Sequence, residues 1–329
     1  MTILVTGGAG YVGSHTVRAM LEAGYSVVVA DNLSTGFRAA VPAACRLYEG
    51  DIRDAAFLTE IFEKEEIDGV IHFAAFSQVG ESGKVPLRYY ENNVGGTRVL
   101  LEQMTAHGVD TIVFSSSAAV YGEPEQVPIE ETAPLHPTNC YGDTKLAMER
   151  MFYWASVAHG IHFVALRYFN ACGAHMSGKI GEAHNPETHL IPIVLQVPNG
   201  QRDHVSIFGD DYPTRDGTCV RDYIHVTDLA SAHILAAEYL MNGGENNVFN
   251  LGNGVGFTVK EIIDTAEKVV GKSIKCEMVA RRAGDPAQLV ASSDKAKTAL
   301  GWKPKYDDIE TIIGSAWNWH KEHPHGYDD

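Results

Sequence analysis

Two side chains four residues apart, Tyr141 and Lys145, have the types and spacing needed for acid–base chemistry. If a helix begins at this point, the phenol and the ammonium lie one turn apart on the same face. A free phenol has a pKa of about 10 and is a poor base near neutral pH, but a neighbouring cation favours the phenolate form. Such a pair can remove a proton from a substrate hydroxyl, and the lysine can also hold a ribose hydroxyl of a cofactor.

A Tyr-x-x-x-Lys pair carries little information alone in a chain with 14 tyrosines, because a surface or interface tyrosine is an equal alternative. A catalytic role for the pair is supported by Ser117, the last of three consecutive serines at the end of a predicted strand over residues 111–115. A hydroxyl at that point can share a substrate proton with the phenol. We therefore predict Ser117, Tyr141 and Lys145 as the catalytic residues.

Three glycines near the N-terminus, Gly7, Gly10 and Gly13, lie between the first predicted strand and the first predicted helix. A tight turn, a close approach to a pyrophosphate and the N–H groups of a helix N-terminus all favour small residues there. Asp31 ends the second predicted strand, where a carboxylate can accept both ribose hydroxyls and repel a 2′-phosphate. The pattern predicts NAD rather than NADP; the alternative is that the glycines serve only tight packing.

Short β-branched runs alternate with helical patterns over the first half of the chain. The predicted strands are residues 3–6, 26–30, 47–50, 69–74, 111–115 and 163–167, and the predicted helices are residues 10–23, 55–66, 93–107 and 144–159. Strands with few polar alternations, separated by helices, indicate an α/β fold with a doubly wound parallel (Rossmann) sheet. Ligands of such sheets bind beyond the carboxyl ends of the strands.

Two further groups of residues follow predicted strands and are predicted to contact the adenine and ribose of the cofactor. They are Asp51 with Ile52, and Phe73 with Ala74 and Ala75. A helix cap is the alternative for Asp51, and plain core is the alternative for Phe73.

The alternation of predicted strands and helices stops near residue 175. From there to Gly217, Gly, Pro, Asp and His are frequent and the hydrophobic periodicity is lost. We predict an NAD-binding domain over residues 1–175 and a smaller C-terminal α/β substrate domain over residues 176–329. Part of residues 218–252 is expected to pack back on the first domain. A capping-box pattern at Thr258 and Glu261 predicts a helix that ends at Gly271.

Composition narrows the class of protein. A net charge of −16 disfavours nucleic acid and anionic membranes as partners, so an anionic ligand needs a few local arginines. The five cysteines lie far apart without a C-x-x-C pair, which disfavours disulfides and a thiolate zinc site. With no signal peptide and no long apolar run, a cytoplasmic protein is expected. The histidines at 320, 323 and 325 are interpreted as a solvated tail, and no metal site is predicted.

Several phrases of the sequence resemble the extended short-chain dehydrogenase/reductase family, and in particular its members that act on nucleotide sugars. These phrases are residues 70–74, 79–82, 115–122, 166–170, 220–226, 281–285 and 317–323, so the resemblance covers nearly the whole chain. It implies that NAD stays bound while UDP-glucose and UDP-galactose interconvert by oxidation at C4, rotation of the 4-keto sugar and return of the hydride.

The resemblance also implies individual roles. Tyr141 would take the O4 proton, Ser117 would hydrogen-bond O4, and Lys145 with the cationic nicotinamide would lower the pKa of Tyr141. Further cofactor contacts would be Tyr11, Val12, Asn32, Asn92 and Phe169. The UDP-sugar would be bound by Asn170, His189, Leu190, Ser206, Ile207, Phe208, Arg221, Arg282, Asp285 and Leu289, with the two arginines facing the diphosphate. The family also suggests a homodimer built from the helices after Asn93 and Thr144, although core packing explains these helices equally well.

Three positions depart from the family pattern. Ser77 stands where some members have a lysine that contacts NAD, so retention of NAD must depend on other contacts. His189 replaces an asparagine that touches the diphosphate. Leu289 replaces a tyrosine that narrows the hexose pocket near C2, which predicts some tolerance of an N-acetyl group.

Other functions were weighed against C4 epimerisation. A nucleotide-sugar 4,6-dehydratase needs an Asp-Glu pair directly after the serine, where this chain has Ala118 and Ala119. An NAD-sensing regulator has no need of Tyr141 or Lys145. A dehydrogenase that releases NADH, or an epimerase for another nucleotide sugar, stays open on the residues alone.

Overall fold

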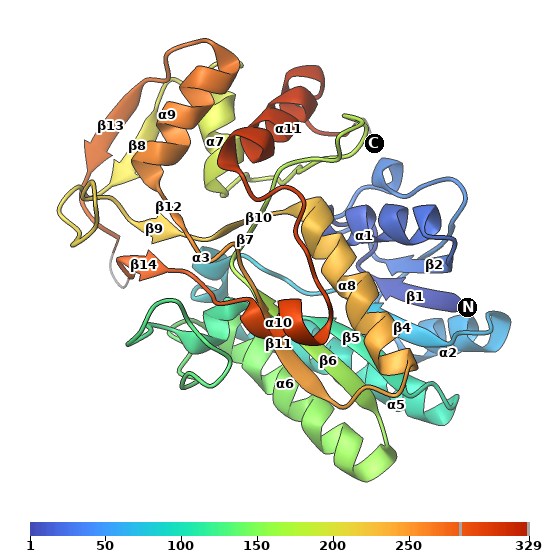
Figure 1. The fold of residues 1–329 in the computed structure, drawn as a ribbon. Helices are drawn as coiled ribbons and strands as arrows, with labels where there is room; N and C mark the ends of the chain where they lie inside the picture. Colours follow the sequence, from blue (N-terminus) through green and yellow to red (C-terminus); the bar gives the residue numbers. More distant parts are fainter. Residues whose placement is uncertain (283–284, 328–329) are drawn as a thin grey trace.

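The structure, a computed structural model, describes residues 1–282 and 285–327 (Figure 1). Residues 283–284, in the middle of the family phrase 281–285, and residues 328–329, at the end of the predicted second domain, lie outside the described residues. Among the described residues, no helix has the length and apolar character needed to cross a membrane.

A seven-stranded sheet in the order β11-β6-β5-β4-β1-β2-β3 forms the centre of the larger unit, and all of its strands are parallel. The strands are β1 (Thr2–Thr6), β2 (Ser26–Asp31), β3 (Arg46–Glu49), β4 (Gly69–His72), β5 (Thr111–Ser115), β6 (His162–Tyr168) and β11 (Asn247–Leu251). The chain builds the sheet outward from β1 in one direction and from β4 in the other. The predicted doubly wound Rossmann sheet is therefore confirmed, with its switch of direction between β1 and β4.

Helices cover both faces of this sheet because both faces of its strands are apolar. On β1, Ile3 and Val5 belong to one hydrophobic core, and Leu4 belongs to another on the opposite face. The first core is closed by α1 (Tyr11–Glu22) and α8 (Val226–Met241), and the second by α2 (Ala55–Lys64), α5 (Gly96–Ala106) and α6 (Cys140–His159). The strands thus expose their carboxyl ends, not their faces, to a ligand.

A smaller unit follows in the C-terminal part of the chain (Figure 1). Its hydrophobic core is formed by α7 (Leu190–Gln196), α9 (Val259–Val270) and α11 (Ile309–Glu322), together with the parallel pair β8 (Val205–Phe208) and β13 (Cys276–Val279). The capping box at Thr258 and the C-terminal Gly271 of α9 are confirmed. The remaining short elements are α3 (Val79–Ser82), α4 (Pro86–Tyr89), β7 (Asn170–Cys172), β9 (Val220–Arg221), β10 (Tyr223–His225), β12 (Phe257–Thr258), β14 (Gln288–Leu289), α10 (Asp294–Ala299) and the helical turns η1 (Arg38–Ala40), η2 (Tyr90–Gly95) and η3 (Ala118–Tyr121).

The two units interleave. Strand β11 pairs with β6 at one edge of the large sheet, and α8 packs on α1 in the first core, although both elements follow residue 218. The segment between residues 173 and 217, which was expected to be irregular throughout, contains α7 and β8. Both elements are short, so they leave little periodicity for a sequence pattern to detect.

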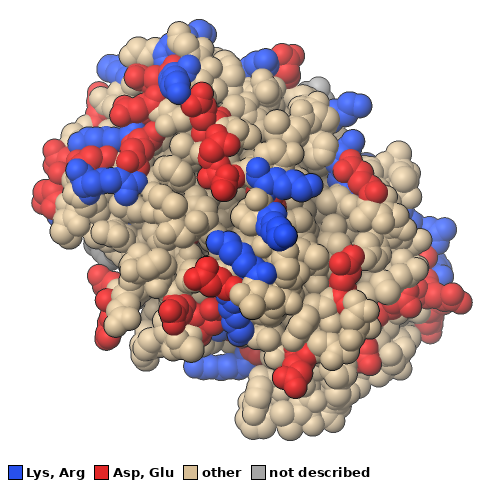
Figure 2. Space-filling view, in the orientation of Figure 1, with Lys and Arg blue, Asp and Glu red and all other residues tan. Residues whose placement is uncertain are grey.

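The negative charge of the chain is not spread as one uniform field. Figure 2 shows Lys and Arg side chains interspersed among Asp and Glu on the face drawn, with several basic groups near its middle. Locally positive regions therefore exist on a chain of net charge −16, as an anionic ligand requires.

Candidate active site

The glycine loop lies at the switch point of the sheet, against the residues that follow β4. Gly7 has a positive φ of 75°, and a Cβ there would lie 2.6 Å from the backbone nitrogen of Ala74. A Cβ on Gly13 would lie 2.1 Å from the carbonyl oxygen of Gly7. Close backbone packing thus requires glycine at both positions and brings the ends of β1 and β4 together.

The N-terminus of α1 is suited to bind a pyrophosphate. Its N-cap is Gly10, which places no side chain on the first N–H groups of the helix. Those N–H groups have no partner within the helix, and the helix dipole adds a partial positive charge. Tyr11 and Val12 begin this helix, and the Tyr11 hydroxyl donates to the carbonyl of Gly173 (2.6 Å).

Asp31 ends β2 beside the glycine loop. One carboxylate oxygen accepts from the backbone N–H of Ala9 (2.9 Å), and the other accepts from Leu33 (2.9 Å). Burial raises the pKa of Asp31, and these two hydrogen bonds lower it in part. The two hydrogen bonds therefore fix the carboxylate at the edge of the loop.

Asp51 and Asn32 meet beyond the ends of β3 and β2. The Asn32 side chain donates to Asp51 (3.1 Å), and Arg53 forms an ion pair with Asp51 (2.7 Å). The hydrogen bond from Arg53 lowers the pKa of Asp51 to about 2. Asp54, not Asp51, is the N-cap of α2, so the helix-cap alternative for Asp51 is wrong.

The other predicted cofactor contacts surround the same sheet edge. Ile52 is buried against Gly96 at the start of α5. The backbone N–H groups of Phe73 and Ala74 both donate to the carbonyl of Thr6, which ties them to the end of β1. Asn92 is buried in η2, Ala75 is half-buried, and Ser77 is exposed.

The helix α6 begins where Tyr141 and Lys145 need it to begin. Asn139 is its N-cap and accepts from the N–H of Gly142 (2.8 Å), so both residues lie in the first two turns. The Lys145 ammonium donates to the carbonyl of Ser115 (2.8 Å) and lies 5.8 Å from the centre of the Tyr141 ring. The predicted arrangement on one helix face thus places both side chains beside the carboxyl end of β5.

The electrostatics of this pair differ from the simplest expectation. Burial raises the pKa of Tyr141, and a hydrogen bond with Ser117 lowers it in part. Burial lowers the pKa of Lys145 to about 7, and the charge of Glu149 opposes that effect. Lys145 alone therefore does not bring the phenol into the neutral range, because the protein environment disfavours charge on both groups.

Ser117 lies two residues after the end of β5 and is the N-cap of η3, where its hydroxyl oxygen accepts from the N–H of Ala119 (3.1 Å). A Cβ on Gly142 of α6 would lie 2.6 Å from the carbonyl of Ala119, so glycine is needed for this close approach. This packing holds the serine beside the tyrosine. The structure brings Ser117, Tyr141 and Lys145 together.

A buried network of ion pairs and hydrogen bonds contacts the elements that carry Ser117, Tyr141 and Lys145. The Glu149 carboxylate on α6 forms an ion pair with Arg167 on β6 and accepts from the hydroxyl of Ser116 (2.5 Å). Arg167 also donates to the Tyr121 hydroxyl (2.9 Å), which donates to Asn250 on β11 (2.7 Å). Because buried ions must be paired, removing one partner would leave an uncompensated charge and loosen α6.

The smaller unit reaches the same edge of the sheet through β14 and the segment after β6. Leu289 and Phe169 pack on a core cluster that contains Ala118, Tyr121 and Leu146. Asn170 donates to the carbonyl of Asp222 (2.8 Å). Leu289, predicted on the sugar side, and Phe169, predicted as a cofactor contact, therefore lie beside the elements that carry Ser117 and Lys145.

Two arginines lie on the smaller unit near β8 and β9. Arg221 forms an ion pair with Asp285, and Arg282 lies over the ring of Phe208 at 3.8 Å. Ser206, Ile207 and Phe208 form most of β8, next to β13. Among residues 1–282 and 285–327, the exposed guanidinium of Arg282 stacks on Phe208 and has no ionic partner, which leaves its N–H groups available to an anion.

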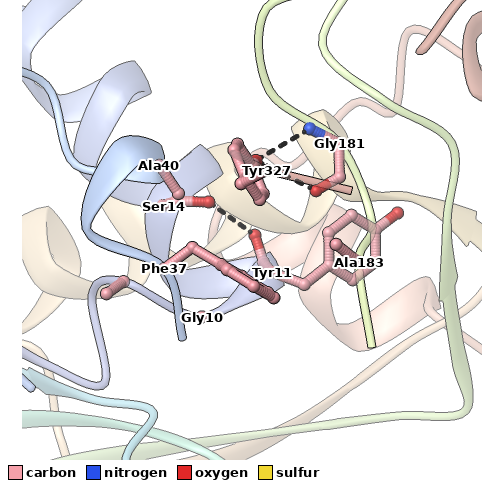
Figure 3. A pocket seen from close by; sticks show the side chains of 9 residues that line it. Gly10, Tyr11, Ser14, Phe37, Ala40, Gly181, Ala183 and Tyr327 are labelled. Atoms are coloured by element: carbon pink, nitrogen blue, oxygen red, sulfur yellow. Dashed lines mark hydrogen bonds between the residues drawn. The ribbon is translucent and has the colours of Figure 1, made fainter. Parts of the chain in front are cut away.

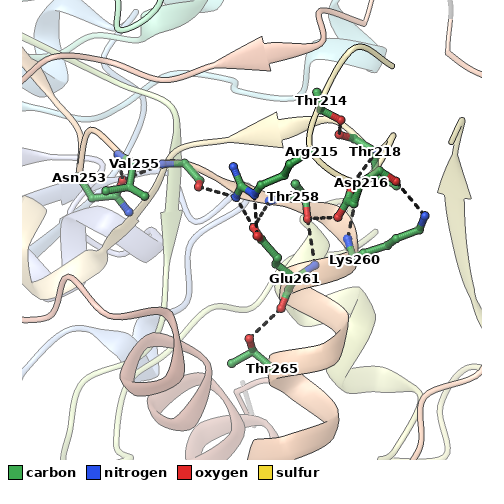
Figure 4. Close-up of polar contacts among 11 residues, drawn as sticks. Thr214, Arg215, Asp216, Thr218, Asn253, Val255, Thr258, Lys260, Glu261 and Thr265 are labelled. Carbon is green, nitrogen blue, oxygen red and sulfur yellow. Dashed lines mark hydrogen bonds and ion pairs between the residues drawn. The ribbon is translucent and has the colours of Figure 1, made fainter. Parts of the chain in front are cut away.

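The loop between β8 and β9 is anchored to the start of α9 (Figure 4). Arg215 forms an ion pair with Glu261, and Thr258 donates to Asp216. Lys260 donates to the Asp216 carbonyl (3.0 Å). These contacts fix the strand that carries Arg221.

His189 lies at the N-cap of α7, directly before Leu190, and its ring contacts Glu182. Burial opposes its protonation, but the charge of Glu182 and the hydrogen bond to it raise the pKa of His189. Glu182, His184 and Glu187 are neighbours of His189 that the sequence analysis did not single out. The spacing Glu-x-His-x-x-Glu-x-His was the available signal.

The fold and the site define a dinucleotide-binding enzyme with a glycine loop at the switch point of a Rossmann sheet and a Ser–Tyr–Lys set at the carboxyl end of β5. The model of the NAD dependent epimerase/dehydratase family matches residues 3–252, and the chain belongs to this family.

Individual relatives and solved structures match over the full length. A protein of Lacticaseibacillus casei named UDP-glucose 4-epimerase is 59% identical, with 100% of this chain and 99% of that protein covered. A crystal structure of a UDP-glucose 4-epimerase has a TM-score of 0.99 at 54% identity, with both chains covered completely. The enzyme from Bifidobacterium longum, solved with NAD+ and UDP, has a TM-score of 0.94 at 41% identity over 99% of this chain and 100% of that one.

Proposed function

We propose that this chain is a UDP-glucose 4-epimerase, an isomerase that uses NAD to interconvert UDP-glucose and UDP-galactose. The observation that carries the proposal is the convergence of Ser117, Tyr141 and Lys145 beside a glycine loop, in a chain 59% identical to a protein of that name over its whole length. We also propose that residues 1–175 bind NAD and that most of residues 176–329 bind the UDP-sugar.

The residues present fit NAD. The glycine loop brings the backbone close to the N-terminus of α1, and the fixed carboxylate of Asp31 beside this loop supports a role in binding the ribose hydroxyls. When bound, NAD would accept the hydride from C4 and later return it, and its nicotinamide ring would add a positive charge to the site. The charge is needed because burial raises the pKa of Tyr141 and lowers that of Lys145.

Tyr141 takes the proton from O4 as the C4–H bond breaks and the C4=O bond forms. Ser117 donates a hydrogen bond to O4 and keeps it aligned with the phenol. Lys145 holds its ammonium beside the phenol and stabilises the phenolate. After the 4-keto sugar has turned, Tyr141 returns the proton to O4 while hydride is delivered to the other face of C4.

The dehydratase alternative lacks its acid–base pair. Ala118 and Ala119 directly follow Ser117, and Ala118 is fully buried. Neither side chain can donate or accept a proton, so elimination of water from C5 and C6 has no catalyst at this point.

The proposal is tested by incubating purified protein with UDP-galactose and no added cofactor. We expect UDP-glucose to accumulate while the absorbance of free NADH stays unchanged. Stoichiometric NADH without UDP-glucose would identify a dehydrogenase instead, and no turnover of either sugar would refute the proposal.

Arg282 is proposed to bind the diphosphate of the substrate. We expect Arg282→Ala to weaken UDP binding about 10-fold to 100-fold, because hydrogen bonds to charged groups contribute ~1.5–3 kcal/mol. Isothermal titration with UDP measures the change, and bound NAD should be unaffected. Arg281→Ala is the matched control, since Arg281 pairs with Asp211 and stacks on Tyr212. Equal UDP affinity in the wild type and Arg282→Ala would contradict this role.

Leu289 is proposed to leave room for an N-acetyl group at C2 of the hexose. We expect measurable epimerisation of UDP-N-acetylglucosamine by the wild type, and at least a ~10-fold loss of it relative to UDP-glucose in Leu289→Tyr, since steric differences in a pocket contribute ~1–3 kcal/mol. Competing turnover of the two sugars provides the measurement. A wild type that turns over UDP-glucose alone would remove the proposal.

We propose a cytoplasmic homodimer. All five cysteines are free, as a reducing compartment allows. On α6, Tyr153, Trp154 and Val157 are 55%, 66% and 64% exposed, which is unusual for large apolar side chains on one helix. We expect light scattering to give the mass of two chains for the wild type and of one chain for Trp154→Glu. A monomeric wild type would contradict the proposed interface.

A further inference from the structure

A cluster of two histidines and two glutamates lies in the irregular segment before α7, outside the Ser–Tyr–Lys set. Glu182, His184, Glu187 and His189 each place one side-chain donor atom within 4.8 Å of the others. Both imidazole and carboxylate are ligands of first-row divalent metals. We propose that these four residues bind one Zn²⁺ ion.

Two of the distances within the cluster match the edge of a coordination tetrahedron around zinc. His184 Nδ1 lies 3.4 Å from Glu182 Oε1 and 3.4 Å from Glu187 Oε2. These contacts are longer than a typical N–H···O hydrogen bond. Bond lengths of about 2.0–2.1 Å around zinc place neighbouring tetrahedral ligands about 3.3–3.4 Å apart. His189 and Glu182, which are in direct contact, must separate to accept the ion, and pairs of ligand atoms that lie as much as 4.8 Å apart must close towards it.

The charge of the cluster suits a divalent ion. Glu182 is 2% exposed, and Glu187 also faces the histidines. Two carboxylates carry a charge of −2, which Zn²⁺ neutralises while both imidazoles stay neutral. Nitrogen ligands disfavour Ca²⁺ and Mg²⁺, which prefer all-oxygen sites. With four ligands from the protein the site is closed, which is typical of a structural rather than a catalytic zinc ion.

Neighbouring groups hold the proposed ligands in place. Glu187 Oε1 accepts from the backbone N–H groups of Thr188 (2.8 Å) and His189 (2.9 Å), which leaves Oε2 directed at His184. The indole N–H of Trp319 on α11 donates to the carbonyl of Glu182 (3.0 Å). Such outer contacts orient metal ligands and strengthen binding.

The site connects α7 and α11 with the glycine loop. Gly181 and Ala183 flank Glu182 and line a small pocket with Gly10, Tyr11 and Tyr327 (Figure 3). The ring of Tyr11 meets His184 edge to face at 6.2 Å. The ion would therefore hold residues 181–189 against the start of α1. This consequence for NAD rests on the proposed function; zinc binding itself does not.

Metal content of the untagged protein, purified without chelator, is the first test. We expect about one zinc per chain in the wild type and less than about one tenth in His184→Gln, since structural zinc sites bind tightly. His204→Gln is the matched control, because His204 pairs with Glu277 (3.2 Å) outside the cluster. A wild type without zinc that also fails to bind added Zn²⁺ overturns the proposal.

Thermal unfolding of the wild type keeps the proposal testable if His184→Gln fails to fold. We expect chelator to lower Tm, and Zn²⁺ at about a hundredfold excess over Kd to restore it by about 5 °C. We also expect bound NAD to dissociate faster from the chelated protein. A Tm that responds to neither treatment refutes the site. A Tm response without a change in NAD release would leave the zinc site standing and remove its link to the cofactor.

Discussion

Tyr141→Phe is expected to lower kcat for UDP-galactose by about 10²-fold to 10⁴-fold, the range typical of a lost general acid–base group. The phenylalanine ring keeps the shape of the side chain but has no hydroxyl to receive the O4 proton. Tyr141 is also held near Ser117 by a hydrogen bond, which the variant removes. Steady-state turnover with UDP-galactose measures the change.

The fold and the bound cofactor should survive this substitution. Tm and NAD content of Tyr141→Phe are expected to stay near the wild-type values, so that the loss is chemical. Tyr153→Phe is the matched control: it removes a phenol from the same helix, keeps the ring that the proposed dimer interface would cover and should leave kcat unchanged. Wild-type turnover by Tyr141→Phe would contradict the assigned role.

Lys145→Met is expected to lower kcat by a similar factor of about 10²–10⁴, since it removes the charge beside the phenol. Its pH profile identifies the cause. Without the ammonium the pKa of Tyr141 rises further, so the acidic limb of the kcat profile should move to higher pH and the residual activity should grow with pH. Lys64→Met, at an exposed lysine paired with Glu60, is the control. A loss without any shift of the profile would indicate a merely structural role.

The pH dependence of stability distinguishes a loss of catalysis in Lys145→Met from misfolding of the variant. Burial lowers the pKa of Lys145 from its model-compound value of 10.5 to about 7. The unfolded chain therefore binds more protons than the folded chain between pH 7 and 10.5, and the cost of burying the ammonium is fully present below pH 7 and disappears towards pH 10.5. We expect the variant to gain stability relative to the wild type near pH 6, where the wild type buries a charged ammonium. The difference in the free energy of unfolding, variant minus wild type, should therefore be largest near pH 6 and fall as the pH rises towards 10.5. Denaturant unfolding of both proteins near pH 6 and at a pH approaching 10.5 measures this difference.

Much of the fold could be predicted because the sheet is buried on both faces. Strands such as Thr111–Ser115 then read as continuous apolar runs, and the glycine loop and Asp31 mark the ends of two strands. The short elements α7 and β8 were not predicted, because segments of seven and four residues give no clear hydrophobic period. The sequence predicts that part of residues 218–252 packs on the first domain, but the pairing of β11 with β6 is a long-range contact that a local pattern does not identify.

The Ser–Tyr–Lys set could be predicted because its spacing reflects local geometry: Asn139 caps α6 just before Tyr141, and Ser117 follows β5. The lowered pKa of Lys145 could not be predicted from the sequence, because it depends on burial by elements that are distant along the chain. The grouping of Glu182, His184, Glu187 and His189 could not be predicted either. Its residues lie within eight positions, but only the folded course of an irregular segment brings their side chains to one point.

The central claim is that hydride leaves C4 and returns to the same carbon within one closed site, with Tyr141 carrying the proton. Its most direct test uses UDP-galactose labelled with deuterium at C4, the wild type and no added cofactor. The account predicts UDP-glucose that retains the deuterium at C4. Product with ordinary hydrogen at C4, or deuterium that appears in free NADH, would contradict it.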